Sequence, residues 1–375
     1  MRNLTLLVVL GFAMSSAPAS AQQKNGLDQP EDLAQVRELP KEPPQVVVAE
    51  TSRLEFRVSP LSAKGLLSEQ VRGALKALFG QAGSATIVKL RAFVAGSGDT
   101  RRVYTIVSEM FTARRMPLPA VTVVQAGALP LTGVQVVMEA TSVARKLVNP
   151  HGLAFLSAES AASNDYTGRM APLVDKSIER LSGSLRAAGL DGKDVLRTTC
   201  FLSSMDDIRE ARRIVASEFP RAALNFVQPQ RAPSQAMAAC EAVARLRGPA
   251  GEPLRMLAAG EAAQRPFFSP VALVGATRVA LTGGQLAFGY EDTDARLAFQ
   301  RLGKTLGQVG SSTAGAVVTS IYPLSGSIGE QVRRIGPEFF DKTKPPAGTL
   351  VLFEGLPSLD ASFAVDVLAV TSNSQ

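Results

Sequence analysis

Several residue types that often carry chemistry are scarce in this chain of 375 residues, which has no Trp, four Tyr, one His and two Cys. Too few His and Cys are present for a metal site of the usual ligand spacing, so no metal is expected. A Ser/His/Asp arrangement could be built only around His151. That residue stands in the segment Asn-Pro-His-Gly ahead of an apolar run, which indicates a surface turn.

Long apolar runs are also rare. The first one, from Leu4 to Met14, has 11 residues and is shorter than the roughly 20 needed to cross a bilayer. Arg2 precedes it and Ala19-Ser20-Ala21 follows it, a pattern typical of a signal peptide over residues 1–21. We therefore expect a periplasmic or secreted protein with no membrane attachment once this segment is removed.

The charge balance gives little support for nucleic-acid binding. The formal net charge is +7, and hydrophobic and charged residues make up 46% and 19% of the chain, a globular composition. Basic pairs such as Arg114-Arg115 and Arg333-Arg334 are scattered, without interleaved aromatic residues. No nucleic-acid partner is predicted.

Residues 22–44 contain four Pro and many charges without apolar periodicity, which predicts a flexible leader. After it, one pattern occurs three times. A helical stripe ends at Gly83, at Gly189 and at Gly310, where glycine suits a helix C-terminus. A β-rich run and a second amphipathic helix follow each glycine, and Asp99 is expected to cap the first of these second helices.

Each repeat then ends with two strands, and the second of them carries an acidic residue. These residues are Glu139, Glu241 and Asp366 in the three repeats. These residues follow the helix-ending glycines by 56, 52 and 56 positions. A strand also precedes each first helix, so the order is strand, helix, strand, helix, strand, strand. Such an order places both helices on one face of a sheet and leaves an apolar second face that must be covered.

The sequence thus predicts an α+β protein of three units, 45–147 (shortened), 148–250 and 251–375. We expect the units to cover one another's bare sheet faces as an intramolecular pseudo-trimer, so that one chain is a monomer.

The chain resembles the Rid (reactive intermediate deaminase, YjgF-type) family in several motifs. These are Thr282-Gly283-Gly284-Gln285, the run LRAAGLDGKDVLRTTCFL, the segment from Phe339 to Ala347, the closing Glu-Ala-Val-Ala at Glu241, and an opening hairpin matched by 268–275. The resemblance implies a chorismate-mutase-like fold, trimers with interfacial sites, and hydrolysis of enamines or imines without a cofactor. A keto or imino acid would be the ligand.

The residues that the resemblance assigns to this chemistry are absent. Its substrate-binding Arg is replaced by Val121, Ala222 and Gly348, and its water-positioning Glu by Val137, Ala239 and Ala364. Valine and glycine cannot form the bidentate contact that arginine makes with a carboxylate. Arg221 could replace the missing Arg only if a bulge turned it toward the pocket.

Three functional classes stay open: a small-metabolite-binding pseudoenzyme with degenerate sites, which we favour, an imine or enamine deaminase, and a structural scaffold. Candidate ligand-binding residues are Arg221, Gln285, Glu139, Glu241 and Asp366, although the three acids could equally be exposed strand ends or structural hydrogen-bond partners. Cys200 and Cys240 could form a disulfide in an oxidising compartment or remain buried thiols, with Cys240 facing the helices.

Overall fold

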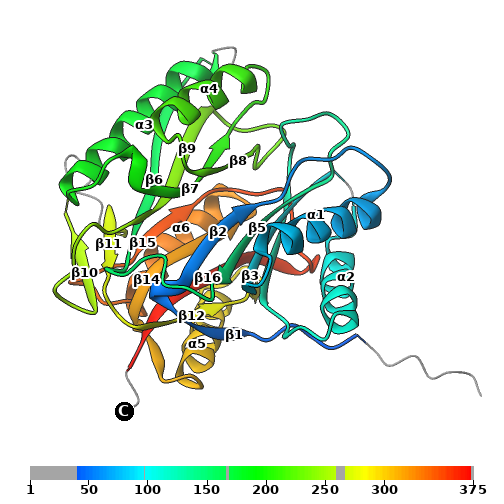
Figure 1. Cartoon of the computed structure of the whole chain (residues 1–375). Coiled ribbons are helices and arrows are strands. Elements are labelled where there is room, and N and C mark those ends of the chain that lie inside the picture. Colours follow the sequence, from blue (N-terminus) through cyan, green and yellow to red (C-terminus); the bar gives the residue numbers. More distant parts are fainter. Residues whose placement is uncertain (1–39, 97, 166–168, 259–266, 373–375) are drawn as a thin grey trace, which may run out of the picture. The chain divides into compact units, whose positions relative to one another are not determined.

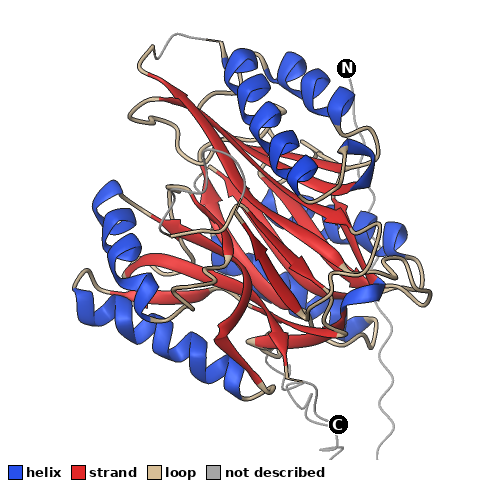
Figure 2. Ribbon diagram, turned by 90° about the vertical axis from the view of Figure 1, so that its left-hand side faces the viewer, coloured by secondary structure: helices blue, strands red, loops and turns tan. Residues whose placement is uncertain are grey.

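Strands occupy the interior of the structure and helices lie around them (Figure 1, Figure 2). The computed structural model describes residues 40–96, 98–165, 169–258 and 267–372. The expected signal peptide and most of the expected leader lie outside the described residues.

Three sheets contain the described strands, and a four-strand order is common to all three. Sheet I has the order β2-β5-β3-β4, sheet II contains β6-β9-β7-β8, and sheet III contains β12-β16-β14-β15. In each set the last two strands of the order pair in parallel, and a helix connects them in the chain. The other pairings are antiparallel. The fold is α+β, as the sequence predicts.

The strands and helices have the following bounds. Sheet I comprises β2 (Leu54–Val58), β3 (Thr86–Ala95), β4 (Ala120–Ala126) and β5 (Val136–Val143), with α1 (Leu67–Ala82) and α2 (Thr100–Ala113). Sheet II comprises β6 (Leu153–Ser163), β7 (Val195–Leu202), β8 (Ala223–Val227), β9 (Ala236–Arg245), β10 (Leu254–Leu257) and β11 (Val271–Val274), with α3 (Met170–Ala187) and α4 (Ile208–Glu218). Sheet III comprises β1 (Val46–Glu50), β12 (Arg278–Thr282), β13 (Gln285–Phe288), β14 (Ser311–Pro323), β15 (Ala347–Leu350) and β16 (Ala361–Thr371), with α5 (Asp292–Gly307) and α6 (Gly326–Ile335). Short 3-10 helices span Thr51–Arg53, Gly192–Asp194 and Gly336–Glu338.

Local sequence determines where the helices begin and end. Gly83, Gly189 and Gly310 have φ values of 58°, 71° and 68°, a left-handed conformation in which glycine carries little strain. The carboxylate of Asp99 accepts a hydrogen bond of 3.0 Å from the backbone N–H of Arg101 and so caps α2. These predictions are confirmed.

The two faces of each sheet are buried in different ways. On one face, both helices of a sheet pack on its strands in a common apolar core. The opposite faces of all three sheets pack on one another, as shown by a cluster that contains Phe93 of β3, Phe201 of β7 and Tyr322 of β14. The sheet faces that would otherwise be bare therefore cover each other.

Two strand pairings differ from the expected unit boundaries. β1, the first described strand, pairs with β12 of sheet III, with Val46 opposite Thr282. β11, in the segment 268–275 expected to open the third unit's own hairpin, pairs instead with β6 of sheet II. A strand bonds to whichever free sheet edge lies beside it, and the apolar pattern of the strand does not encode that choice.

Candidate functional site

The three recurring acidic residues meet at the centre of the molecule. Glu139, Glu241 and Asp366 lie on β5, β9 and β16, where each stands opposite a central-strand residue: Arg91, Thr199 or Ser320. Their exposed fractions are only 2%, 6% and 8%. All three acids also border a cavity of about 70 Å³ that residues of all three sheets line.

Each acid accepts a hydrogen bond from the edge strand of a different sheet. The Asn225 amide of β8 donates to Glu139 at 2.7 Å, and the Thr122 hydroxyl of β4 donates to Asp366 at 2.6 Å. The Thr349 hydroxyl of β15 donates to Glu241. The three bonds connect sheet II to I, I to III and III to II, which closes a ring.

Three cations neutralise the three acids. Arg91 donates from Nε to Glu139 at 2.8 Å and from Nη2 to Glu241. The Lys89 ammonium lies 3.2 Å from Asp366, and Arg197 lies 3.3 Å from Glu139. We call these six charged residues, with Thr122, Asn225 and Thr349, the central polar cluster. A buried charge without such partners would cost several kcal/mol.

The charge states of the cluster follow from this pairing. Burial by itself would raise the pKa of Glu139, but the positive charges of Arg91 and Arg197 outweigh it and lower the pKa to about 2. Burial lowers the pKa of Lys89, and Asp366 offsets part of that effect. Glu139 is therefore a carboxylate bound within the protein.

Sequence analysis found the acids of this cluster but not their partners. Lys89, Arg91 and Arg197 stand within the β-rich runs IVKLRAFV and VLRTTCFL, where a charged residue in an otherwise apolar strand could have been the signal. Thr122, Asn225 and Thr349 reach the acids only because separate sheets pack together, and no pattern in the neighbouring sequence predicts these hydrogen bonds.

The other two candidate ligand-binding residues lie apart from the cluster. Gln285 begins β13 opposite Val365 and is half-buried. Arg221 lies in an exposed turn two residues before β8 begins. No bulge on a strand turns Arg221 inward, because Arg221 is not part of a strand.

The register of β8 also corrects the position that the sequence analysis assigned to the missing substrate-binding arginine of the second unit. Asn225 stands opposite Thr199, as Thr122 stands opposite Arg91 and Thr349 opposite Ser320. The position that matches Val121 and Gly348 is therefore Leu224 rather than Ala222. Leucine, like valine and glycine, offers no charge to a carboxylate.

A cleft of about 480 Å³ lies between sheets II and III, and we call it the II–III cleft. Its lining consists of Ala158, Ser160, Gln235, Met237, Ala239, Phe267, Phe268, Arg333, Pro337, Gly348, Leu350 and Val351. A second hollow of about 200 Å³ shares Gln235, Met237, Arg333, Leu350 and Val351 with it. The two hollows therefore adjoin.

Gly348 brings the backbone of β15 close to this cleft. Its N–H donates to the Ser157 hydroxyl of β6 at 2.7 Å and so links sheets III and II. A Cβ atom at this position would come within 2.2 Å of the Phe268 ring. The aromatic ring thus occupies the space into which a residue-348 side chain would project.

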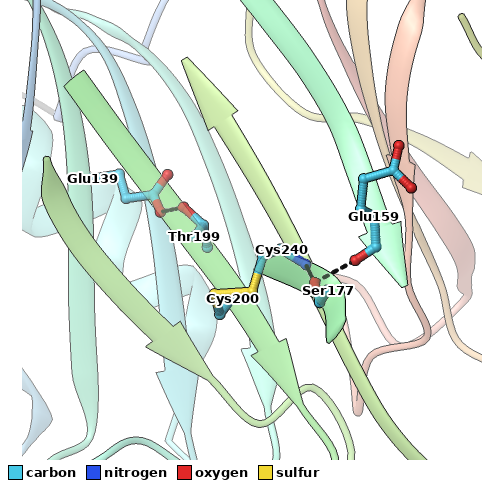
Figure 3. Close-up of a disulfide and its surroundings, with 6 residues drawn as sticks. All are labelled: Glu139, Glu159, Ser177, Thr199, Cys200 and Cys240. Carbon is cyan, nitrogen blue, oxygen red and sulfur yellow. Dashed lines mark hydrogen bonds between the residues drawn. A yellow bond between two sulfur atoms is a disulfide. The ribbon is translucent and has the colours of Figure 1, made fainter. Parts of the chain in front are cut away.

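The cysteines form a disulfide, which resolves the alternatives left open by the sequence. Cys200 and Cys240 are directly opposite on β7 and β9, with Cα atoms 4.1 Å apart, and both lie in the helix-facing core of sheet II. Figure 3 shows the neighbouring Thr199 directed instead toward Glu139. Alternation along β7 therefore separates the disulfide from the central polar cluster.

His151 is exposed in a turn and lines a wide hollow of about 1420 Å³. Among the described residues, no group of three or more His, Cys, Asp or Glu side chains is placed to hold a metal ion. In the same part of the chain, none of the helices combines the length and apolar character of a membrane span.

No protein-family model matches the chain, and no curated protein matches it. Several solved structures with partial similarity are described as YjgF or Rid family proteins. One from Neisseria meningitidis is 14% identical, with 32% of this chain and 97% of that chain covered and a TM-score of 0.25. YyfB from Yersinia pestis is 17% identical, with 32% and 99% covered and a TM-score of 0.28. A YjgF/YER057c/UK114 family member from Mycobacterium tuberculosis is 23% identical, with 32% and 99% covered and a TM-score of 0.24.

Proposed function

We propose that this chain is an exported, non-catalytic protein that binds a small organic molecule in the II–III cleft. In this proposal, the three sheets replace the three subunits of a trimer. The common strand order and the ring of hydrogen bonds through Glu139, Glu241 and Asp366 support that arrangement.

The II–III cleft is the observation that carries the proposal. Its volume of about 480 Å³ lies within the range of small-molecule sites, roughly 300 to 1,000 Å³, and most of its lining residues are apolar, with Ser160, Gln235 and Arg333 as polar side chains. The Phe268 ring occupies the space that a side chain at position 348 of β15 would fill. The cleft can therefore enclose a ligand, but without the strand arginine that the Rid resemblance assigns to substrate binding.

Calorimetric titration with a panel of small keto, amino and aryl acids would test binding. Ser160→Phe should fill the cleft and abolish binding, because Ser160 lines it. Ser217→Phe is the matched control, because Ser217 is exposed on α4 and does not line the cleft. Loss of binding in both variants, or in neither, would contradict the assignment of the site.

The absence of catalysis needs its own measurement. Incubation with a freshly generated 2-imino acid should release ammonia no faster than buffer alone. Acceleration by the wild type that disappears in Ser160→Phe would show that this cleft is a deaminase site and would overturn the non-catalytic assignment.

Export and the monomeric state are checked on the full-length gene product expressed in a bacterial host. Mass spectrometry of the periplasmic or secreted fraction should show a chain that begins at Gln22. Sedimentation velocity should show a particle with the mass of one chain. A stable trimer of chains would contradict the replacement of subunits by sheets.

A further inference from the structure

Arg333, in the last turn of α6, is shared by three hollows on this side of the molecule. It lines the II–III cleft, the adjoining hollow of about 200 Å³ and an outer groove of about 790 Å³. Arg333 is therefore the residue that the II–III cleft and the outer groove share.

Arg333 supplies the positive charge at this junction. Among the described residues that line the II–III cleft, it is the one charged side chain. The other lining groups are aromatic, aliphatic, small or neutral polar. A lining of mostly apolar residues with a single cation suits a ligand that has an apolar body and one negative charge.

The ion pair between Arg333 and Glu330 is weak. Its Nη1 donates to Glu330, one helical turn earlier, and their side chains are 47% and 71% exposed. An exposed pair at this spacing contributes little to stability. A bidentate contact with a carboxylate that is partly removed from water is stronger, so a ligand could displace Glu330.

We propose that Arg333 binds the carboxylate of a small organic acid whose apolar part occupies the II–III cleft, and that Glu330 competes with the ligand for Arg333. This inference rests on the proposed binding function and adds the ligand class and the residue that selects it. The cation comes from helix α6, whereas the Rid resemblance assigns this role to an arginine on a strand.

The next residue provides a matched control. Arg334 is on the same helix and forms two contacts with Asp292, one of them 2.8 Å long. It lines the outer groove but neither the II–III cleft nor the adjoining hollow. Replacing Arg333 or Arg334 removes the same charge and one ion pair from the same helix, but only Arg333 reaches the cleft.

The test compares two probes of nearly equal size, 3-phenylpropanoate and its uncharged amide, titrated calorimetrically into the full chain. The expected result for Arg333→Ala is at least tenfold weaker binding of the acid and unchanged binding of the amide. Glu330→Gln should bind the acid a few-fold more tightly, and Arg334→Ala should match the wild type. Raising the salt concentration should weaken binding of the acid only.

Equal effects of Arg333→Ala and Arg334→Ala on the acid would overturn the inference, as would unchanged acid binding in Arg333→Ala. If both probes still bind and Ser160→Phe still abolishes that binding, the binding function stands and only the role of Arg333 fails. If neither probe binds the wild type, both the binding function and the inference fail for this ligand class. Thermal unfolding of each variant confirms that it is folded.

Discussion

Asn225 on β8 donates a 2.7 Å hydrogen bond to Glu139 on β5, 86 residues earlier in the chain. It is one of three such bonds, each of which joins an edge strand of one sheet to a buried acid of another. Because the acids are also neutralised by Lys89, Arg91 and Arg197, packing of the sheets and charge balance depend on the same residues.

Replacing Arg91 with methionine should strongly destabilise the protein. Arg91 pairs with both Glu139 and Glu241, so its loss leaves buried carboxylates with too little positive charge. Breaking a buried pair in this way typically costs about 3 to 5 kcal/mol. Urea unfolding would measure the loss. Arg101→Met, which removes an exposed pair with Asp99, should cost less than about 1 kcal/mol, and equal losses would refute the argument.

Stability should decrease as the pH falls below about 4.5. The pKa of Glu139 is about 2 in the folded protein, against an ordinary value of 4.5 for the exposed group in the unfolded chain. The unfolded chain therefore takes up the proton first, and the stability contributed by the carboxylate is present above pH 4.5 and lost toward pH 2. Unfolding free energies measured between pH 5 and pH 3 should fall less steeply for Glu139→Gln than for the wild type. Identical slopes would mean that this carboxylate is not the cause.

Reduction of the disulfide should lower the unfolding free energy. Cys200 and Cys240 are 40 residues apart in sequence, and a native disulfide in a small exported domain typically contributes about 2 to 5 kcal/mol. Urea unfolding with and without dithiothreitol would measure this difference. The Cys200→Ala/Cys240→Ala double variant should show no response to the reductant. The prediction fails if thiol titration of the unfolded, unreduced protein finds free cysteines.

A methyl group at Gly348 should disturb the II–III cleft. Gly348→Ala would place Cβ about 2.2 Å from the Phe268 ring, which must then move. Overpacking of this kind costs roughly 1 to 3 kcal/mol. The cost should largely vanish in a Phe268→Ala background, as a double-mutant cycle would show. Gly326→Ala is the control, because a Cβ there has no atom within 4 Å and its effect should stay within about 1 kcal/mol. Additive effects of the first two substitutions would contradict the contact.

The acids of the central polar cluster could be located from the sequence, but their bonding and the II–III cleft could not. The recurrence of Glu139, Glu241 and Asp366 marked equivalent strand positions, and these acids do meet. Their position left three interpretations: a ligand site, an exposed strand end and a structural hydrogen-bond partner. To choose among these interpretations one must know that Thr122, Asn225 and Thr349 donate hydrogen bonds to the acids. These contacts form only after separate sheets pack together.

Local sequence was enough to predict the ends of helices and the apolar faces of strands. Gly83, Gly189, Gly310 and Asp99 act on the backbone within a few residues of themselves, so local conformational preferences are enough. The pairing of β1 with β12, the pairing of β11 with β6 and the contact between Phe268 and Gly348 arise only when the whole chain packs together. Backbone hydrogen bonds are nearly the same for every strand, so partners are selected by the edges and side chains that folding brings into contact.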